Sequence, residues 1–175
     1  MLIVESSHRS VNGSYLANMV AEKYPGAERL RLADIKYTGC TACKKCREAD
    51  STCVLEDDLT PVLKKLTSEK SIVLISPNYM GFMNGGMKMF LDRFYCMRDS
   101  HKRSRFTEGA KLAFFMTQGS GNRNKGDLCV NWLKNMCEHY SLKYYGHTIP
   151  NCADDNTDGV RLKQEEIGMN LSFFF

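Results

Sequence analysis

Four of the chain's eight cysteines lie within the fifteen residues of segment 39–53. The sequence GCTACKKCREADSTC spaces Cys40, Cys43 and Cys46 as C-x2-C-x2-C, and Cys53 follows after six intervening residues. Thiols gathered in this way form disulfides, bind zinc, ligate an iron–sulfur cluster or act as a thiol redox centre. The segment is therefore the first candidate for chemistry.

The compartment of the protein bears on that choice. No apolar run approaches the roughly 20 residues that a membrane helix needs, and the N-terminus MLIVESSHR lacks the basic region and apolar stretch of a secretory signal. We therefore expect a cytoplasmic protein without a membrane segment. In a reducing cytosol, clustered cysteines are more often metal-binding or redox-active than disulfide-bonded.

Three polar, glycine-containing turns follow apolar runs and form a second group of candidates. The turn SSHRSVNGS (6–14) offers hydroxyl groups and an arginine just before a helix, which suits a phosphate group without being a P-loop. The turn SPNYMGFMNGGMK (76–88) offers an aromatic ring, an amide and flexible glycines, and TQGSGN (117–122) again lets backbone approach a ligand. Each turn alone is a weak signal, because such residues are common in loops.

The elements that would position these turns alternate between strands and helices. We expect five strands, over 2–7, 27–34, 70–77, 110–117 and 143–150, and five helices, over 15–24, 56–69, 84–99, 128–142 and 158–171. Such alternation predicts one three-layer α/β domain over residues 1–175, with a five-stranded parallel sheet covered by helices on both faces. The carboxyl ends of parallel strands share one rim, so the three turns should meet there.

The formal net charge is +4, and the densest basic stretch is RDSHKRSR, residues 98–105. It is either a solvated loop or a patch that attracts an acidic partner or the extra phosphate of NADPH. We do not expect nucleic acid as a partner, because no basic motif interleaved with aromatic residues accompanies it.

Taken together, these motifs resemble the flavodoxin-like NADPH-dependent FMN reductase family, and particularly its iron–sulfur flavoprotein branch. SSHRSVNGS resembles the family's phosphate loop, and the cysteine segment followed by VLEDDL resembles its cysteine-rich segment before an acidic pair. ISPNYMGFMNGGMKMFLDRF resembles the family's S-P-x-Y…K-x-F-x-D-R stretch, and TQGSG resembles its third flavin-contacting loop. The resemblance covers roughly residues 1–125. One departure is the order Asn12-Gly13-Ser14, where the family has Gly-Asn-Thr/Ser, which moves the flexible residue by one position.

The resemblance implies a flavodoxin-like fold, bound FMN and a [4Fe–4S] cluster. The FMN phosphate would lie on the first loop and the isoalloxazine ring between the other two. The implied FMN-binding residues are Ser7, Arg9, Asn12, Gly13, Ser14, Pro77, Asn78, Tyr79, Met80, Gly81, Thr117, Gly119, Ser120 and Gly121. The implied cluster ligands are Cys40, Cys43, Cys46 and Cys53, whose spacing fits a cluster better than the separated pairs usual for zinc. The helix residues Lys88, Asp92 and Arg93 are as readily explained by salt bridges, and the other four cysteines by packing.

The function implied by the resemblance is an FMN-dependent oxidoreductase. Electrons would pass from NAD(P)H or a ferredoxin-like donor through FMN to a quinone, a free flavin or a protein acceptor, in a homodimer or larger homo-oligomer. No catalytic acid or base is identified. The sequence leaves open a non-enzymatic electron carrier or redox sensor on the same fold, a plain FMN reductase without metal, and a zinc-stabilised interaction module without flavin.

Overall fold

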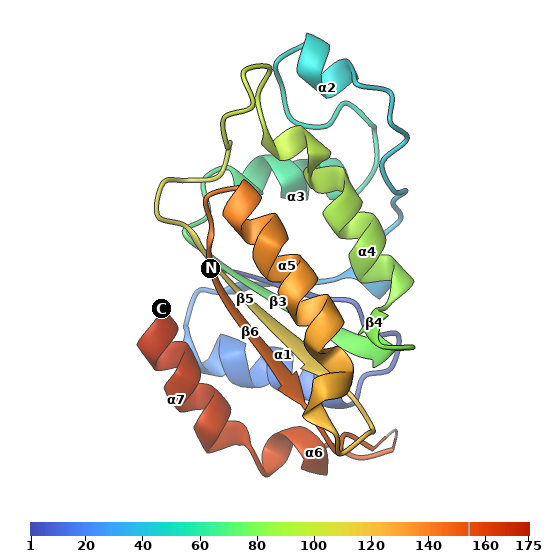
Figure 1. Cartoon of the computed structure of the whole chain (residues 1–175), viewed down its shortest axis with the longest axis vertical. Helices are drawn as coiled ribbons and strands as arrows, with labels where there is room; N and C mark the ends of the chain where they lie inside the picture. Colours follow the sequence, from blue (N-terminus) through green and yellow to red (C-terminus); the bar gives the residue numbers. More distant parts are fainter. Residues whose placement is uncertain (154) are drawn as a thin grey trace.

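The computed structural model, which describes residues 1–153 and 155–175, places a parallel sheet between two layers of helices (Figure 1). Five strands run parallel in the order β2-β1-β3-β5-β6. Their bounds are Leu2–Glu5 for β1, Glu28–Arg31 for β2, Ser71–Tyr79 for β3, Lys111–Thr117 for β5 and Lys143–Ile149 for β6. This confirms the fold class predicted from the sequence. A further strand, β4 (Phe82–Met83), pairs antiparallel with the end of β3; two residues are too few to show a periodicity.

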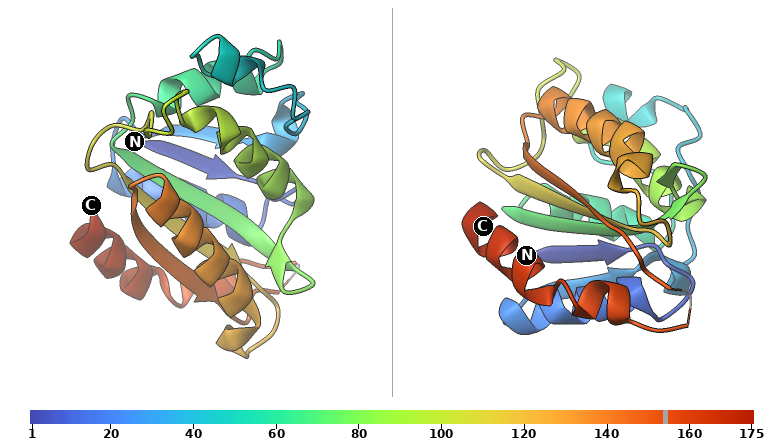
Figure 2. Two further views of the ribbon diagram at one scale, coloured as in Figure 1. Left: turned by 45° about the horizontal axis from the view of Figure 1, so that its top comes forward. Right: turned by 60° about the horizontal axis from the view of Figure 1, so that its bottom comes forward.

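Helices cover both faces of the sheet, as the edge-on view in Figure 2 shows. One face carries α1 (Asn12–Lys23), α6 (Asp158–Arg161) and α7 (Gln164–Phe174), and the other carries α3 (Leu59–Leu66), α4 (Gly85–Asp92) and α5 (Asp127–His139). Successive residues of a strand point to opposite faces. Val73 and Ile75 of β3 therefore pack under α1, while Ile72 and Leu74 pack on the opposite face. This two-sided burial explains why the central strands are apolar without interruption.

Several boundaries differ from those expected. The helix predicted over 84–99 is α4 followed by the 3₁₀ helix η2 (Arg93–Met97), and the one predicted over 158–171 divides into α6 and α7. The second strand ends at Arg31 and continues as the 3₁₀ helix η1 (Leu32–Asp34). The cysteine segment contains a one-turn helix, α2 (Lys45–Glu48), and a further 3₁₀ helix, η3 (Arg123–Gly126), precedes α5. Tertiary packing sets these ends, and local sequence patterns locate them poorly.

Two ends of the molecule matter for function. The carboxyl ends of β1, β3 and β5 form one end, where β4 and the start of α4 also lie (Figure 1). From there α4 and η2 run to the opposite end, where α2 and the loop after η2 lie side by side (Figures 1 and 2). The eight residues of α4 and the five of η2 span roughly 20 Å at normal helical rise.

Candidate functional site

A cleft of about 310 Å³ opens at the carboxyl ends of the strands. Residues of all three sequence-predicted turns line it, together with the segment after β6. The predicted residues among them are Ser7, Arg9, Asn12, Gly13, Pro77, Asn78, Tyr79, Thr117 and Gly119. The structure thus brings together most of a set that is scattered over more than a hundred positions of the sequence.

The first wall of the cleft is the loop between β1 and α1. The Ser7 hydroxyl donates to the Arg9 carbonyl oxygen at 2.9 Å and accepts from the Arg9 N–H at 3.2 Å, which folds the loop into a tight turn. In the described part of the chain, no side chain caps the N-terminus of α1. The first N–H groups of α1 therefore lack intrahelical partners, and Asn12 and Gly13, which carry two of them, line the cleft. Such a helix terminus favours an anion.

Residues 12–14 belong to the first turn of α1, and not to the preceding loop as the sequence suggested. Gly13 does not have a positive φ. Its importance is close packing, because a Cβ there would lie 3.2 Å from the Cβ of Ser7. The order Asn12-Gly13-Ser14 therefore does not move a residue with unusual backbone angles by one position, as the sequence suggested, because Gly13 has ordinary helical angles.

The side-chain NH₂ group of Asn12 and the hydroxyl of Ser14 are already hydrogen-bonded within the protein, whereas the Asn12 side-chain oxygen has no partner among the described residues. The side-chain amide of Asn12 donates to the carbonyl oxygens of Ala153 at 2.7 Å and Asn156 at 3.0 Å, so it ties the segment after β6 to α1. The Ser14 hydroxyl is buried and donates to a carboxylate oxygen of Glu5 at 3.3 Å. Asn12 can still offer its backbone N–H group, but Ser14 lies outside the cleft lining.

Glu5 places a fully buried carboxylate beneath the first loop. Its charge is balanced by Arg29, which forms an ion pair with it, and by Arg31 at 3.8 Å, both from the neighbouring strand β2. This pairing matters because an unbalanced carboxylate below the helix start would repel a phosphate group.

The second and third loops are joined by a direct hydrogen bond. The Asn78 side-chain amide donates to the side-chain carbonyl of Gln118 at 2.8 Å, and Asn78 accepts from the Gly81 N–H at 2.9 Å. Gln118 also donates to the carbonyl oxygens of Ser120 at 3.1 Å and Asn122 at 2.6 Å. One amide pair thus fixes the separation of the two loops across the cleft.

A tight hairpin carries Tyr79 to the cleft edge. Met80 and Gly81 connect β3 to β4 with φ of +57° and +86°, the left-handed backbone that two-residue hairpins need. Tyr79 is half exposed, and the side chain of Met80 projects fully into solvent. A half-exposed ring beside a polar cleft suits stacking against a planar ligand.

Five residues named from the sequence lie outside the cleft lining: Ser14, Met80, Gly81, Ser120 and Gly121. Gly81 and Ser120 shape the loops through their backbone hydrogen bonds. Conversely, Val11, Gln118, Cys152 and Ala153 line the cleft but were not foreseen. Gln118 could have been predicted, because it lies within the turn TQGSGN. Cys152 and Ala153 could not, because only the sheet topology brings the segment after β6 to the cleft.

The four clustered cysteines surround a recess at the far end of the molecule. Cys40, Cys43, Cys46 and Cys53 all line it, and so does Cys96 from η2, which the sequence suggested was only a packing residue. Cys40 and Cys43 are exposed and Cys46 is buried. All eight cysteines are unpaired in the structure.

The recess shapes the acidity of its thiols. Burial, and then the nearby Cys53, raise the pKa of Cys46, and burial raises the pKa of Cys96 to about 12. The Lys45 backbone N–H lowers the pKa of the exposed Cys43. Within the described residues, no three His, Cys, Asp or Glu side chains are arranged to hold a single metal ion. The thiols therefore surround the recess without converging on one point.

A buried ion pair closes the stem of the cysteine segment. The side chain of Arg93 is fully buried and donates to Asp57 Oδ2 at 2.7 Å, to the Thr38 carbonyl oxygen at 3.0 Å and to the Thr60 hydroxyl at 2.9 Å. Asp57 also accepts from the Thr38 N–H at 3.2 Å. Arg93 therefore joins the residues before and after the four thiols. Lys88 and Asp92, by contrast, pair with each other on the exposed face of α4, which confirms the salt-bridge interpretation for these two residues.

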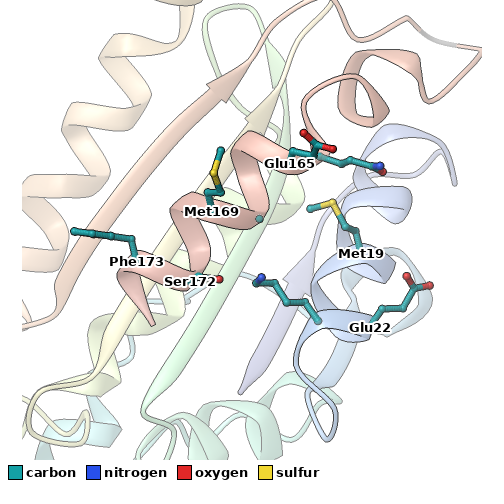
Figure 3. Close-up of a pocket in the computed structure, with 9 residues that line it drawn as sticks. Met19, Glu22, Glu165, Met169, Ser172 and Phe173 are labelled. Carbon is teal, nitrogen blue, oxygen red and sulfur yellow. The ribbon is translucent and has the colours of Figure 1, made fainter.

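A larger hollow, about 980 Å³, lies between α1 and α7 (Figure 3). Met19 and Glu22 of α1 and Glu165 and Met169 of α7 are among the side chains that line it (Figure 3). None of the three turns contributes to its lining. Volume alone does not make it the site, because the convergent polar groups that mark a cofactor pocket are at the smaller cleft.

Comparison with known proteins agrees with this geometry. The sequence model of the family described as NADPH-dependent FMN reductase matches residues 1–152. An iron–sulfur flavoprotein of Methanocaldococcus jannaschii is 36% identical over 76 residues, which are 43% of this chain and 39% of that protein. An iron–sulfur flavoprotein of Archaeoglobus fulgidus is 29% identical over 130 residues, covering 72% of this chain and 61% of that protein. The chain thus spans less than two thirds of the length of these relatives.

Solved structures share the fold at low identity. An NAD(P)H:quinone oxidoreductase from Methanothermobacter marburgensis superposes with a TM-score of 0.72 at 11% identity, covering 97% of this chain and 98% of that one. An FMN-dependent NADH-azoreductase from Bacillus anthracis, solved in complex with FMN, superposes with a TM-score of 0.70 at 12% identity, covering 98% of both chains.

Proposed function

This chain belongs to the NADPH-dependent FMN reductase family, and from that premise we propose that it passes electrons from NAD(P)H or a reduced redox protein through FMN to a quinone, a flavin or a protein acceptor. The observation that carries the proposal is the meeting of three separate loops and a helix N-terminus at one cleft. FMN, when bound, supplies the hydride and electron chemistry, and the protein supplies binding, orientation and electrostatics.

The residues of the cleft support one orientation of FMN. The start of α1 and the turn of Ser7 and Arg9 would provide donors and positive charge for the phosphate group. The Asn78–Gln118 bridge holds the two loops that would flank the isoalloxazine ring, and Tyr79 would face it. No side chain in the cleft is assigned as a proton donor, since flavin hydride chemistry does not require one.

The cysteine segment supports the proposal of a [4Fe–4S] cluster. Its four thiols line one recess and match in number the ligand set of such a cluster, and their spacing in the sequence differs from the two separated pairs usual for zinc. Lys44, Lys45 and Arg47 would offset part of the negative charge of a thiolate-ligated cluster. Arg93 would hold Cys53 and the stem of the segment in place. Such a cluster would supply one-electron transfer.

The separation of the two sites supports an assembly of several copies. Within one chain, the recess and the cleft share no lining residue, and α4 lies between the loop at the cleft and the η2 residues of the recess. We therefore propose a homodimer or larger homo-oligomer in which the cysteine segment of one copy approaches the flavin cleft of another. No helix of the described residues is long and apolar enough to cross a membrane. Separately, we propose a cytoplasmic location, because thiols stay unpaired in a reducing cytoplasm.

The test is an absorption spectrum of protein purified without oxygen, with FMN, iron and zinc assayed in the same sample. Flavin with close to four irons per chain, the content of a cube, supports both cofactors. Flavin without metal leaves a plain FMN reductase, and zinc without flavin overturns the proposal. Stopped-flow reduction by NADPH then separates an enzyme from a carrier, because a carrier that accepts electrons only from a redox protein would stay oxidised.

A further inference from the structure

Glu5 lies beneath the first loop of the cleft, at the last position of β1. Its side chain is fully buried, and it does not line the cleft. A Cβ on Gly13 would lie 3.7 Å from Glu5 Oε2 and 3.2 Å from the Cβ of Ser7, a residue that does line the cleft. The carboxylate and this wall of the cleft therefore pack against the same residue of α1.

The two oxygens of this carboxylate have different surroundings. Oε1 accepts from the Ser14 hydroxyl at 3.3 Å and from the Arg29 guanidinium, and it lies 3.8 Å from Nε of Arg31. Oε2 is buried and has no hydrogen-bond partner among the described residues. It lies under the start of α1, where the first N–H groups lack intrahelical partners. The positive end of the α1 dipole therefore acts on Glu5 from within the protein, and on any anion in the cleft.

Arg29 and Arg31 hold their charges on β2 beside Glu5, and each has a second anchor. Arg29 donates to the side-chain oxygen of Asn18, and Arg31 donates to the His8 carbonyl oxygen at 2.8 Å. Neither arginine lines the cleft. Two guanidinium groups and one buried carboxylate leave an excess of one positive charge behind the loop.

The balance of these charges acts on a phosphate group but not on a neutral ligand. Charges in a partly buried setting interact over several ångströms, because the protein screens them less than water does. Among the parts of FMN, the phosphate carries the charge, and riboflavin lacks it. Glu5 opposes a phosphate group in the cleft, and the two arginines favour it. Asp34, which pairs with Arg31 at 3.2 Å, is 63% exposed and therefore contributes less.

We propose that Glu5 determines how strongly the site prefers FMN over riboflavin, through its charge and without contacting the ligand, an inference that rests on FMN binding in the proposed function. The carboxylate holds the phosphate affinity below the level that the helix terminus and the two arginines would give without it. A structural role alone, in which Glu5 only supports the loop and holds β2 beside β1, would affect both flavins alike. The ratio of the two affinities therefore separates these roles.

The experiment measures the dissociation constants of FMN and of riboflavin for the full chain by flavin fluorescence. Glu5→Gln keeps the shape of the side chain and removes its charge, so it should tighten FMN binding by about tenfold or more and change riboflavin binding by less than about threefold. Arg29→Gln shifts the charge in the opposite direction at a partly exposed side chain. It should weaken FMN binding by about tenfold and again leave riboflavin binding within about threefold. The matched control is Asp34→Asn, which removes an exposed carboxylate from Arg31 and should change FMN binding by less than about threefold.

An equal change in the affinities for FMN and riboflavin in Glu5→Gln would overturn the proposal, and so would FMN binding that is unchanged or weaker. Circular dichroism checks that each variant is folded. If Glu5→Gln does not fold, Arg29→Gln decides, because an unchanged ratio of the two affinities in that variant would show that charge behind the loop has no effect. Unmodified protein that binds neither flavin would refute the proposed function itself, whereas flavin binding that ignores these charges would refute only the role of Glu5.

Discussion

The ion pair between Arg93 and Asp57 gives the sharpest prediction about the cysteine segment. The substitution Asp57→Asn keeps the shape of the side chain but removes its charge. Arg93, whose side chain is fully buried, would then be an uncompensated buried cation. Breaking a buried pair in this way costs about 3–5 kcal/mol. In a chain of 175 residues, that corresponds to a fall in Tm of roughly 6–20 °C.

The assays are thermal and urea denaturation of the purified holoprotein, monitored by circular dichroism, together with the reactivity of its thiols toward a colorimetric reagent. The control is Asp92→Asn, which removes the charge of the residue that pairs with Lys88 on the exposed face of α4. This substitution should lower the free energy of unfolding by less than about 1 kcal/mol. In Asp57→Asn, the buried Cys46 should also become reactive at urea concentrations below the global transition, because the stem that Arg93 closes would open first.

A double variant checks whether the charge is responsible. Replacing both partners, Asp57→Asn with Arg93→Met, removes the buried cation together with its counter-ion. It should be more stable than Asp57→Asn alone, since apolar replacement of a whole buried pair is often neutral. If Asp57→Asn were no less stable than Asp92→Asn, the reasoning about this ion pair would be refuted.

The remaining predictions concern the cleft and the sheet. Asn78→Ala removes the bridge to Gln118. It should weaken FMN binding by about 5- to 30-fold, corresponding to a hydrogen-bonded contact of about 1–2 kcal/mol, with little change in Tm. An unchanged dissociation constant in fluorescence titration would contradict the assigned role. Gly13→Ala adds a Cβ 3.2 Å from that of Ser7; it should displace the start of α1 and lower FMN affinity more than the analogous Ala at the unconfined Gly85. Burial lowers the pKa of His147, so the unfolded chain binds more protons than the folded one below about pH 6.5. The free energy of unfolding should therefore fall as the pH is lowered below that value. His147→Gln should flatten this part of the stability–pH curve measured by urea denaturation.

Predictability from sequence varied with the range of the interactions. The apolar residues 72–75 within the predicted strand 70–77 identified a central strand, because a strand buried on both faces is predominantly apolar. The three turns were recognisable because glycine, serine and asparagine are needed where a chain leaves a strand and approaches a ligand. The sequence did not show that the side chains of Asn12 and Ser14 form hydrogen bonds within the protein. These bonds depend on Ala153 and Glu5, which the folded chain brings beside them.

By itself, then, the sequence determined the alternation of strands and helices, the rim at which the loops would meet, and a segment rich in thiols. These follow from periodicity and residue chemistry, which are local. Only the tertiary structure decided that Arg93 closes the thiol segment, that Cys96 joins its recess, and that the stretch 98–105 faces the thiols and not the flavin cleft. Those outcomes depend on contacts between residues 36 to 55 positions apart, and no local pattern encodes which distant groups the packed sheet will bring together.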